Sequence, residues 1–503
     1  MSRPAAAEAD GLAATAAAAL VTDSAGAPEP TDSAASSERS PKASSAKKRA
    51  KLERSGAKQK QRGAPTPGRC AFFLEKKRRY CSMRPGPGKR YCGVHECEAA
   101  AADGGAAPLR PRVPCPIDPS HTVFADQLTH HLKVCTLAKQ QRAERQQPYF
   151  RAALNAGPAL AAPAGAVCPV ARTPLRPRED APGFARRIEA LYAAHVGSVR
   201  AVHLKAEECD GLLQRASTAG AEHATLRHLT QQASILGNME RVGILRPGGV
   251  GGGSGDGAAF VEFGAGRGML SLAVREALPT APLLLVERGV VRNKADRDLR
   301  KSAATAEFER VKIDIRDLDL RHAPLTERCG RCVAVSKHLC GVATDLTLRC
   351  LHNASGAGGA GGGGGAAPPD AAAPQAEPPR PVQVGGIAIA LCCHHCMNWT
   401  DFVGRDFFAQ AGLDAQAFEA IRTATSWCTE SAGAKAGLSA EERALCGRRC
   451  KRLLDAGRLW WLREVAGMAA ELVEYCEPQT SLENALLLAW PRAEPPEPAT
   501  AVQ

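Results

Sequence analysis

Short apolar runs alternate with helical patterns over the second half of the chain. The runs AFVEF, LLLVE, RVKIDI, VAVSKHL and IAIALCC, which begin at residues 259, 283, 310, 333 and 387, have the length and residue types of buried strands. Alternating strands and helices predict an α/β domain whose parallel sheet is covered on both faces. SLENALLLAW, residues 481–490, is expected to supply the last strand.

The rest of the chain divides into segments of different composition. Residues 1–66 are rich in alanine, serine and lysine, which predicts a disordered basic tail. Residues 138–183 have the composition of a linker, and residues 184–245 place apolar residues at helical spacing, which predicts a helical segment. The α/β domain is expected over residues 246–495. A glycine- and proline-rich run at 353–381 is expected to be a disordered insertion in it.

Charge is distributed unevenly along the chain, which has a formal net charge of +13. Residues 1–38 hold one basic and six acidic residues, whereas residues 39–62 hold ten basic and one acidic, and residues 68–98 hold eight basic and three acidic. This basic block favours a polyphosphate partner, and its KKRAK run equally fits a nuclear address. No segment has the pattern of a membrane span or a secretion signal. We expect a nuclear or cytoplasmic protein without a membrane partner; its oligomeric state stays open.

Nineteen cysteines in such a chain favour metal ligands over disulfides, because a reducing compartment keeps thiols free. Two short segments, 67–98 and 112–137, space cysteines and histidines as a tetrahedral zinc ion requires and hold too few apolar residues to fold without a metal. In the second, DQLTHHLKVC places two ligands one helical turn apart and leaves His130 on the surface. The predicted zinc ligands are Cys70, Cys81, Cys92 and His95 in the first segment and Cys115, His121, His131 and Cys135 in the second.

The first strand runs directly into the glycine turn GAGRG and then into a helical pattern. Glu262 followed by Gly264, Gly266 and Gly268 differs from the G-x-G-x-x-G spacing of dinucleotide sites. An acid before the glycines is typical of S-adenosylmethionine sites, where no pyrophosphate has to be held. A glycine-rich turn without any cofactor is the alternative interpretation.

Two more acids end the next two strands. Glu287 follows LLLV, where its carboxylate can accept hydrogen bonds from both ribose hydroxyls, and Asp314 follows VKI, where it can reach the adenine amine. Because the carboxyl ends of parallel strands meet at one edge of a sheet, Glu262, Glu287 and Asp314 are expected to converge with the glycines on one cofactor crevice.

The fourth and fifth strands end at the same edge and carry the polar residues predicted to surround a methyl acceptor. SKHLCGVATD supplies Lys337, His338 and Asp345, and CCHHC at 392–396 supplies His394. Lys337 can stabilise a developing alkoxide, and His338 or His394 can take its proton. The alternative role for each is to orient the backbone or the cofactor. CCHHC can instead form a third metal site, although five adjacent ligand-type residues do not readily surround one ion.

Together these motifs resemble one family. The match covers most of residues 68–490, and its members are eukaryotic tRNA 2′-O-methyltransferases that act on nucleotide 4 of the acceptor stem. The motifs are the two Cys/His segments, QQASILGN, VEFGAGRG, SKHLCGVATDLTLRC, ALCCHH, GRRCKRLLDAGR and SLENALLLA.

The resemblance implies a Rossmann-like, seven-stranded methyltransferase domain preceded by two zinc fingers and the helical segment. It also implies S-adenosylmethionine as the methyl donor, zinc in the fingers, and tRNA as the partner. Basic residues of the first finger and of GRRCKR are expected to contact phosphates. A non-catalytic RNA-binding scaffold and a methyltransferase that acts on another RNA are the alternatives.

Overall fold

The computed structural model describes residues 65–96, 111–158, 175–246, 257–301, 307–357, 379–428 and 437–492, except positions 76, 77, 94, 120, 176, 178 and 293. These residues form two structural units, 65–142 and 143–492. Most of the predicted tail and of the predicted insertion lies outside the described residues.

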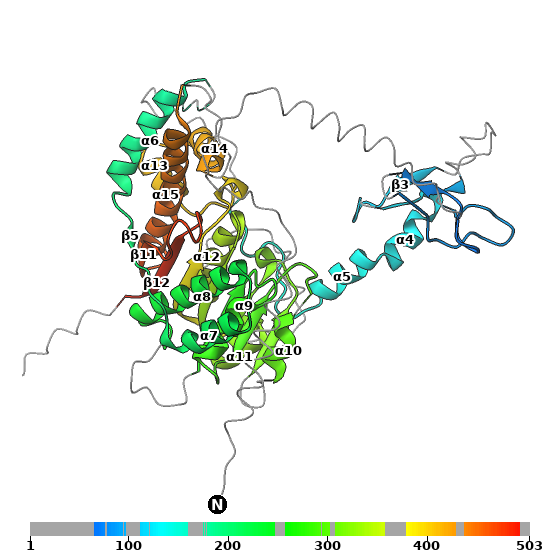
Figure 1. The fold of residues 1–503 in the computed structure, drawn as a ribbon, viewed down its shortest axis with the longest axis horizontal. Helices are drawn as coiled ribbons and strands as arrows, with labels where there is room; N and C mark the ends of the chain where they lie inside the picture. The colour runs from blue at the N-terminus through cyan, green and yellow to red at the C-terminus, as the bar shows by residue number, and fades with distance from the viewer. Residues whose placement is uncertain are drawn as a thin grey trace, which may run out of the picture. The chain divides into compact units, whose positions relative to one another are not determined.

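The larger unit is built on one eight-stranded sheet with the order β5-β11-β12-β10-β9-β6-β7-β8. Figure 1 labels β5, β11 and β12 of this sheet. The five strands from β10 to β8 are parallel, whereas β12 is antiparallel to both β10 and β11. Strands β6, β7 and β8 follow one another toward one end of the sheet, whereas β9 and β10 lie on the other side of β6. The strand order therefore reverses between β6 and β9. The strands are β5 (Arg200–Ala201), β6 (Ala259–Phe263), β7 (Leu283–Val286), β8 (Phe308–Val311), β9 (Arg331–Lys337), β10 (Gln383–Ala390), β11 (Met468–Glu474) and β12 (Ala485–Pro491).

The predicted Rossmann-like sheet is confirmed, with one short strand added at its edge. The five apolar runs correspond to β6–β10, and SLENALLLAW contains β12. Sequence patterns did not indicate β11, because MAAELVE is rich in alanine and glutamate, or β5, which has only two residues.

Helices cover both faces of the sheet, as the alternating pattern predicts. One face packs against α8 (His223–Arg241), α9 (Met269–Ala277) and α10 (Lys294–Lys301). The other packs against α11 (Pro324–Cys329), α12 (Val342–Ala354) and the end of α15 (Ala440–Glu464). Side chains alternate between the two cores along each strand: Phe260 faces the first and Val261 the second.

The segment before the glycine turn is part of this unit. Within it α7 (Asp210–Thr218) packs on α8, whose stretch 231–239 is completely buried, and β5 pairs with β11. Residues 148–158, inside the predicted linker, also join the core: Tyr149 is buried there, and Asn155 donates hydrogen bonds to the carbonyls of Ile315 and Leu318. The predicted linker is therefore partly a structural element of the larger unit.

A separate helical layer forms around α15. The helices α6 (Ala181–His195), α13 (Arg405–Gln410) and α14 (Ala415–Ala424) gather beside it (Figure 1). The core between them is rich in phenylalanine. A capping box between Ser439 and Glu442 starts α15. Within the part of the chain that the structure describes, no helix is apolar enough over a sufficient length to cross a membrane.

The smaller unit contains two minimal folds. In the first, β1 (Phe73–Leu74) and β2 (Arg79–Tyr80) form a hairpin. In the second, β3 (Arg112–Pro114) pairs with β4 (Thr122–Phe124) and is followed by α4 (Leu128–Val134). The helix α5 (Thr136–Arg145) follows at once. Each fold has only a few buried side chains, most of them cysteines, which leaves little apolar burial to stabilise it.

Candidate active site

The glycine turn adopts a backbone that only glycine takes readily. Gly264, Gly266 and Gly268 all have positive φ angles, of 61°, 48° and 76°. A Cβ on Gly268 would lie 2.6 Å from Leu285 Cδ2, whereas one on Gly266 would meet nothing within 4 Å. The missing side chain at Gly268 lets the turn pack on β7, and the backbone at Gly266 faces open space.

Glu287 and Asp314 lie beside this turn, as predicted. Glu287 Oε2 accepts a hydrogen bond from the Gly266 N–H at 2.9 Å, and its Oε1 accepts one from Gly289 at 2.6 Å. Asp314 Oδ1 accepts from the Arg316 N–H at 3.0 Å, and its other oxygen lies 3.3 Å from the Arg288 guanidinium. Both carboxylates line one cavity of about 300 Å³, a size suited to a small organic ligand.

Glu262 occupies a different position from the other two acids. Its side chain is 4% exposed and accepts hydrogen bonds from both the backbone N–H and the hydroxyl of Ser271, at 2.9 and 2.5 Å. Burial raises the pKa of Glu262 to about 7, against the lowering effect of these bonds. Glu262 therefore caps the first turn of α9 beneath the glycine turn and is not among the residues that line the cavity.

Lys337 ends β9 and His338 follows it, at the same edge of the sheet. His338 lines the cavity and has a φ of 66°, unusual for a residue other than glycine. Lys337 is half-buried, and burial lowers its pKa to about 8, partly offset by Cys476 and Glu262. Loss of hydration and the Lys337 charge also lower the pKa of His338. The ring of His228, which the sequence did not single out, lies 6.4 Å from that of His338.

Asp345 and His394 lie in a buried network outside the cavity lining. Asp345, 1% exposed, lies 2.7 Å from Nη2 of Arg458, which also donates to the Gly341 carbonyl. His394 Nε2 lies 2.6 Å from Asp455 Oδ1, and Asp455 contacts Arg458 at 3.3 Å. The two predicted catalytic residues are thus joined through α15, and Arg458 and Asp455 are the members that the sequence did not reveal.

The basic motif GRRCKR does not form the predicted phosphate track. Lys451 and Arg452 are buried and pair with Glu483 and Asp455, and Arg449 pairs with Glu189. Only Arg448 of this motif is exposed. The pairs with Glu483 and Glu189 hold α15 in place, which the sequence could not show because both glutamates lie far from the motif along the chain.

Both predicted zinc clusters are assembled. In each, the four ligand atoms lie within 4.8 Å of one another. His95 Nδ1 lies 3.6 Å from Cys70 Sγ and 3.4 Å from Cys92 Sγ, and the His95 ring stacks on Phe72. In the second cluster, Asp118 Oδ2 lies 3.1 Å from His121 Nδ1 and leaves Nε2 facing His131. A carboxylate on the far nitrogen of a histidine is a frequent feature of zinc sites. His130 is exposed, as predicted.

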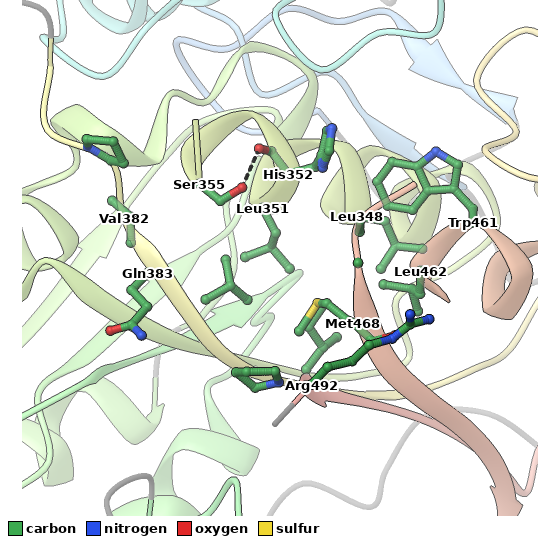
Figure 2. Close-up of a pocket in the computed structure, with 16 residues that line it drawn as sticks. Leu348, Leu351, His352, Ser355, Val382, Gln383, Trp461, Leu462, Met468 and Arg492 are labelled. Carbon is green, nitrogen blue, oxygen red and sulfur yellow. Dashed lines mark hydrogen bonds between the residues drawn. The ribbon is translucent and has the colours of Figure 1, made fainter. Parts of the chain in front are cut away.

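A second cavity, of about 470 Å³, lies at the opposite edge of the sheet (Figure 2). It is lined by the start of β10 and β11 together with apolar side chains that include Leu351, Trp461 and Met468. Arg492 and His352 are the ionisable side chains at its border, and Ser355 Oγ donates to the His352 carbonyl. None of the predicted site residues reaches this cavity.

Comparison with known proteins places this geometry in a family. A model described as "Methyltransferase TRM13" matches residues 230–490, which include every strand of the sheet except β5. The chain belongs to the TRM13 methyltransferase family. A "CCCH zinc finger in TRM13 protein" matches residues 68–96, and a "U11-48K-like CHHC zinc finger" matches 112–136. The eight zinc ligands predicted from the sequence all lie in these two matches.

Related TRM13 proteins are similar over nearly their whole length. A Mus musculus protein named "tRNA:m(4)X modification enzyme TRM13 homolog" is 33% identical, over 88% of this chain and 98% of that protein. The Saccharomyces cerevisiae "tRNA:m(4)X modification enzyme TRM13" is 28% identical, over 84% and 95%. Among solved structures, the SAH-bound Podospora anserina methyltransferase PaMTH1 aligns with 62% of this chain and 97% of its own at 9% identity and a TM-score of 0.27.

Proposed function

We propose that this TRM13 protein is a tRNA methyltransferase that transfers a methyl group from S-adenosylmethionine to the ribose 2′-hydroxyl of nucleotide 4 in the acceptor stem. The observation that carries the proposal is the coincidence of the family match with a cavity lined by Gly264, Glu287 and Asp314. Relatives that match over nearly their whole length are named as tRNA modification enzymes. Two zinc fingers, modules common in RNA-binding proteins, support a nucleic-acid substrate.

The residues around the cavity suit this cofactor. Glu287 has two carboxylate oxygens, each already accepting one backbone hydrogen bond and each with further acceptor capacity for a ribose hydroxyl. Asp314 offers an acceptor for the adenine amine, and the turn at Gly266 leaves space for the amino-acid part. When bound, S-adenosylmethionine supplies an electrophilic methyl group.

We assign the proton of the acceptor hydroxyl to His338. Its side chain lines the cavity, whereas His394 and Asp345 are buried and are not among the lining residues. We assign Lys337 no direct role in the transfer, because it is not among the residues that line the cavity. Asp345 and His394 have a structural role, because they tie α12 and the loop after β10 to α15. Positioning is the main requirement of a displacement with so reactive a donor.

A ribose hydroxyl in a helical stem suits a site of this kind. A-form RNA presents its 2′-hydroxyls across a wide, shallow groove, so such an acceptor is reachable without unpairing the stem. Most base atoms of a paired nucleotide are not.

The test is methyl transfer from labelled S-adenosylmethionine to unmodified tRNA by the purified protein, with nuclease digestion that maps the labelled nucleotide and its ribose methylation. We expect one 2′-O-methylated nucleotide at position 4. Glu287→Ala should abolish transfer and binding of S-adenosylhomocysteine, and Glu464→Ala, an exposed acid at the end of α15, should change neither.

The two alternatives give different results in the same experiment. Cofactor binding without transfer to any RNA would favour the non-catalytic scaffold. Transfer to a ribosomal or spliceosomal RNA with none to tRNA would favour the methyltransferase of another RNA.

A further inference from the structure

Three cysteines come together at the wall of the cavity, on loops that follow adjacent strands. Cys340 follows β9, and Cys392 and Cys393 follow β10, about fifty residues later. Their three sulfur atoms lie within 4.8 Å of one another, the same limit that encloses the ligand atoms of each zinc finger. Cys340 Sγ and Cys392 Sγ are 3.1 Å apart, and Cys340 itself lines the cavity.

These separations suit a metal ion better than a disulfide. Zinc–thiolate bonds of about 2.3 Å in a tetrahedron place sulfur atoms about 3.8 Å apart, within the spread of this cluster. A disulfide would need about 2.05 Å and would leave the third thiol unused. The cluster also differs from the metal site that the sequence offered as an alternative, in which CCHHC supplies every ligand. His394 is committed to Asp455, whereas Cys340 comes from the other loop.

The backbone on both loops is held in an unusual conformation. Four non-glycine residues in the described chain have positive φ angles, and two of them are His338, at 66°, and Cys393, at 34°. Gly341, next to Cys340, lies so close to Cys396 that a Cβ there would approach its Cβ to 2.5 Å. Residues other than glycine hold such angles only when their surroundings impose them, and such residues gather at ligand clamps. A shared ligand between the loops would impose them.

We propose that Cys340, Cys392 and Cys393 bind a third zinc ion at the edge of the cavity. Three thiolates leave one position of the tetrahedron, and Cys340 is exposed, so this position is open to solvent or to a further ligand. The ion would join the loop after β9 to the loop after β10 and so fix the wall of the cavity that carries His338. This inference does not depend on the identity of the methyl acceptor.

Counting metal ions tests the proposal without RNA or methyl donor. The full-length protein is purified under a phosphine reductant, equilibrated with zinc, dialysed and measured by inductively coupled plasma mass spectrometry. We expect three zinc ions per chain in the wild type, two in Cys340→Ser and two in Cys392→Ser. Cys329→Ser changes a half-buried cysteine at the end of α11 and should retain three.

Alkylation of the wild type gives a second measurement that does not require folded variants. Cys340, Cys392 and Cys393 should react with iodoacetamide only after a chelator is added, as peptide mass spectrometry would show. Two zinc ions in the wild type, three in both cluster variants, a Cys340–Cys392 disulfide in the reduced preparation, or rapid alkylation without chelator would each overturn the proposal. A wild-type protein that binds three zinc ions but transfers no methyl group would support the zinc site and refute only the proposed function.

Discussion

His394 Nε2 and Asp455 Oδ1 lie 2.6 Å apart in a pair that is almost completely buried. Burial raises the pKa of Asp455, but His394, Arg452 and Arg458 lower it to about 2. Burial lowers the pKa of His394, so a neutral imidazole donates Nε2–H to an ionised carboxylate. The pair and the Asp345–Arg458 ion pair together connect three elements, the loop after β10, α12 and α15.

Asp455→Asn should destabilise the protein strongly. The change removes a buried negative charge that contacts two arginines and a histidine. Removing one partner of a buried ion pair lowers the free energy of unfolding by about 3–5 kcal/mol. Urea denaturation followed by fluorescence measures the loss. Asp406→Asn, an exposed acid on α13, should shift the midpoint little, and an equal shift in both variants would contradict the assigned role.

Asp345→Asn should lower stability rather than catalysis. Its carboxylate is held by Arg458 and does not line the cavity, so transfer per folded molecule should stay within a few-fold of wild type while the free energy of unfolding falls by about 3 kcal/mol. Asp345→Leu combined with Arg458→Met should be less destabilised than either single change, since neither charge is left unpaired. A folded Asp345→Asn protein with kcat reduced a hundredfold would instead make Asp345 catalytic.

Glu262→Gln should remove a pH dependence of stability. The buried carboxyl keeps its proton up to a pKa of about 7, whereas in the unfolded chain it ionises near its ordinary 4.5. Between pH 4.5 and about 7, the folded protein therefore binds one more proton than the unfolded chain. The free energy of unfolding accordingly falls as pH rises through this range. The total is about 3 kcal/mol, since each pH unit between the two pKa values corresponds to about 1.4 kcal/mol.

Urea titrations of wild type and Glu262→Gln at several pH values from about 4.5 to 8 measure this difference. The wild type should lose stability relative to the variant across that range. Parallel curves for the two proteins would show that folding does not shift the pKa of Glu262.

His338→Gln should reduce methyl transfer while cofactor binding is retained. Loss of a general base lowers the rate by about a hundredfold or more. Calorimetric titration with S-adenosylhomocysteine reports binding, and single-turnover transfer to tRNA reports chemistry. His228→Gln changes the neighbouring ring and should lower the rate only a few-fold. Equal rates for wild type and His338→Gln would remove His338 from proton transfer.

Asp118→Ala should weaken zinc binding by the second finger. Its carboxylate orients His121 through Nδ1, and loss of such a partner lowers metal affinity about 10–100-fold. Competition with a chromophoric chelator in the full-length protein measures the affinity. Asp126→Ala, an exposed acid in the same finger, is the matched control. Equal affinities in both variants would show that Asp118 does not support the ligand.

The carboxyl edge of the sheet was largely predictable, and the side chains behind it were not. Strand ends follow from local patterns, and parallel strands bring Glu287, Asp314 and His338 to one edge whatever the details of packing. Ligand spacing likewise identified both zinc clusters, because each is local in sequence.

Long-range pairing limited the prediction elsewhere. Arg458 and Asp345 are more than a hundred residues apart, so no local pattern links them, and an arginine on an amphipathic helix is normally exposed. The role of Glu262 was not predictable for another reason. A glutamate before the glycines has the same place in the sequence whether its carboxylate binds a ligand or accepts hydrogen bonds from Ser271. Cys340 and Cys392 meet only because β9 and β10 are neighbours in the sheet.

The pairing of β5 with β11 has a consequence for where the protein can be shortened. Val473 and Glu474 pair with Arg200 and Ala201, Glu471 binds Arg241, and Ser234 donates to the Tyr475 carbonyl. A fragment cut at residue 230, where the family match begins, would keep the whole cavity yet expose the outer hydrogen-bonding groups of β11. Unpaired strand edges promote association between copies. The smallest soluble catalytic fragment should therefore begin before residue 200, upstream of the methyltransferase match that starts at residue 230.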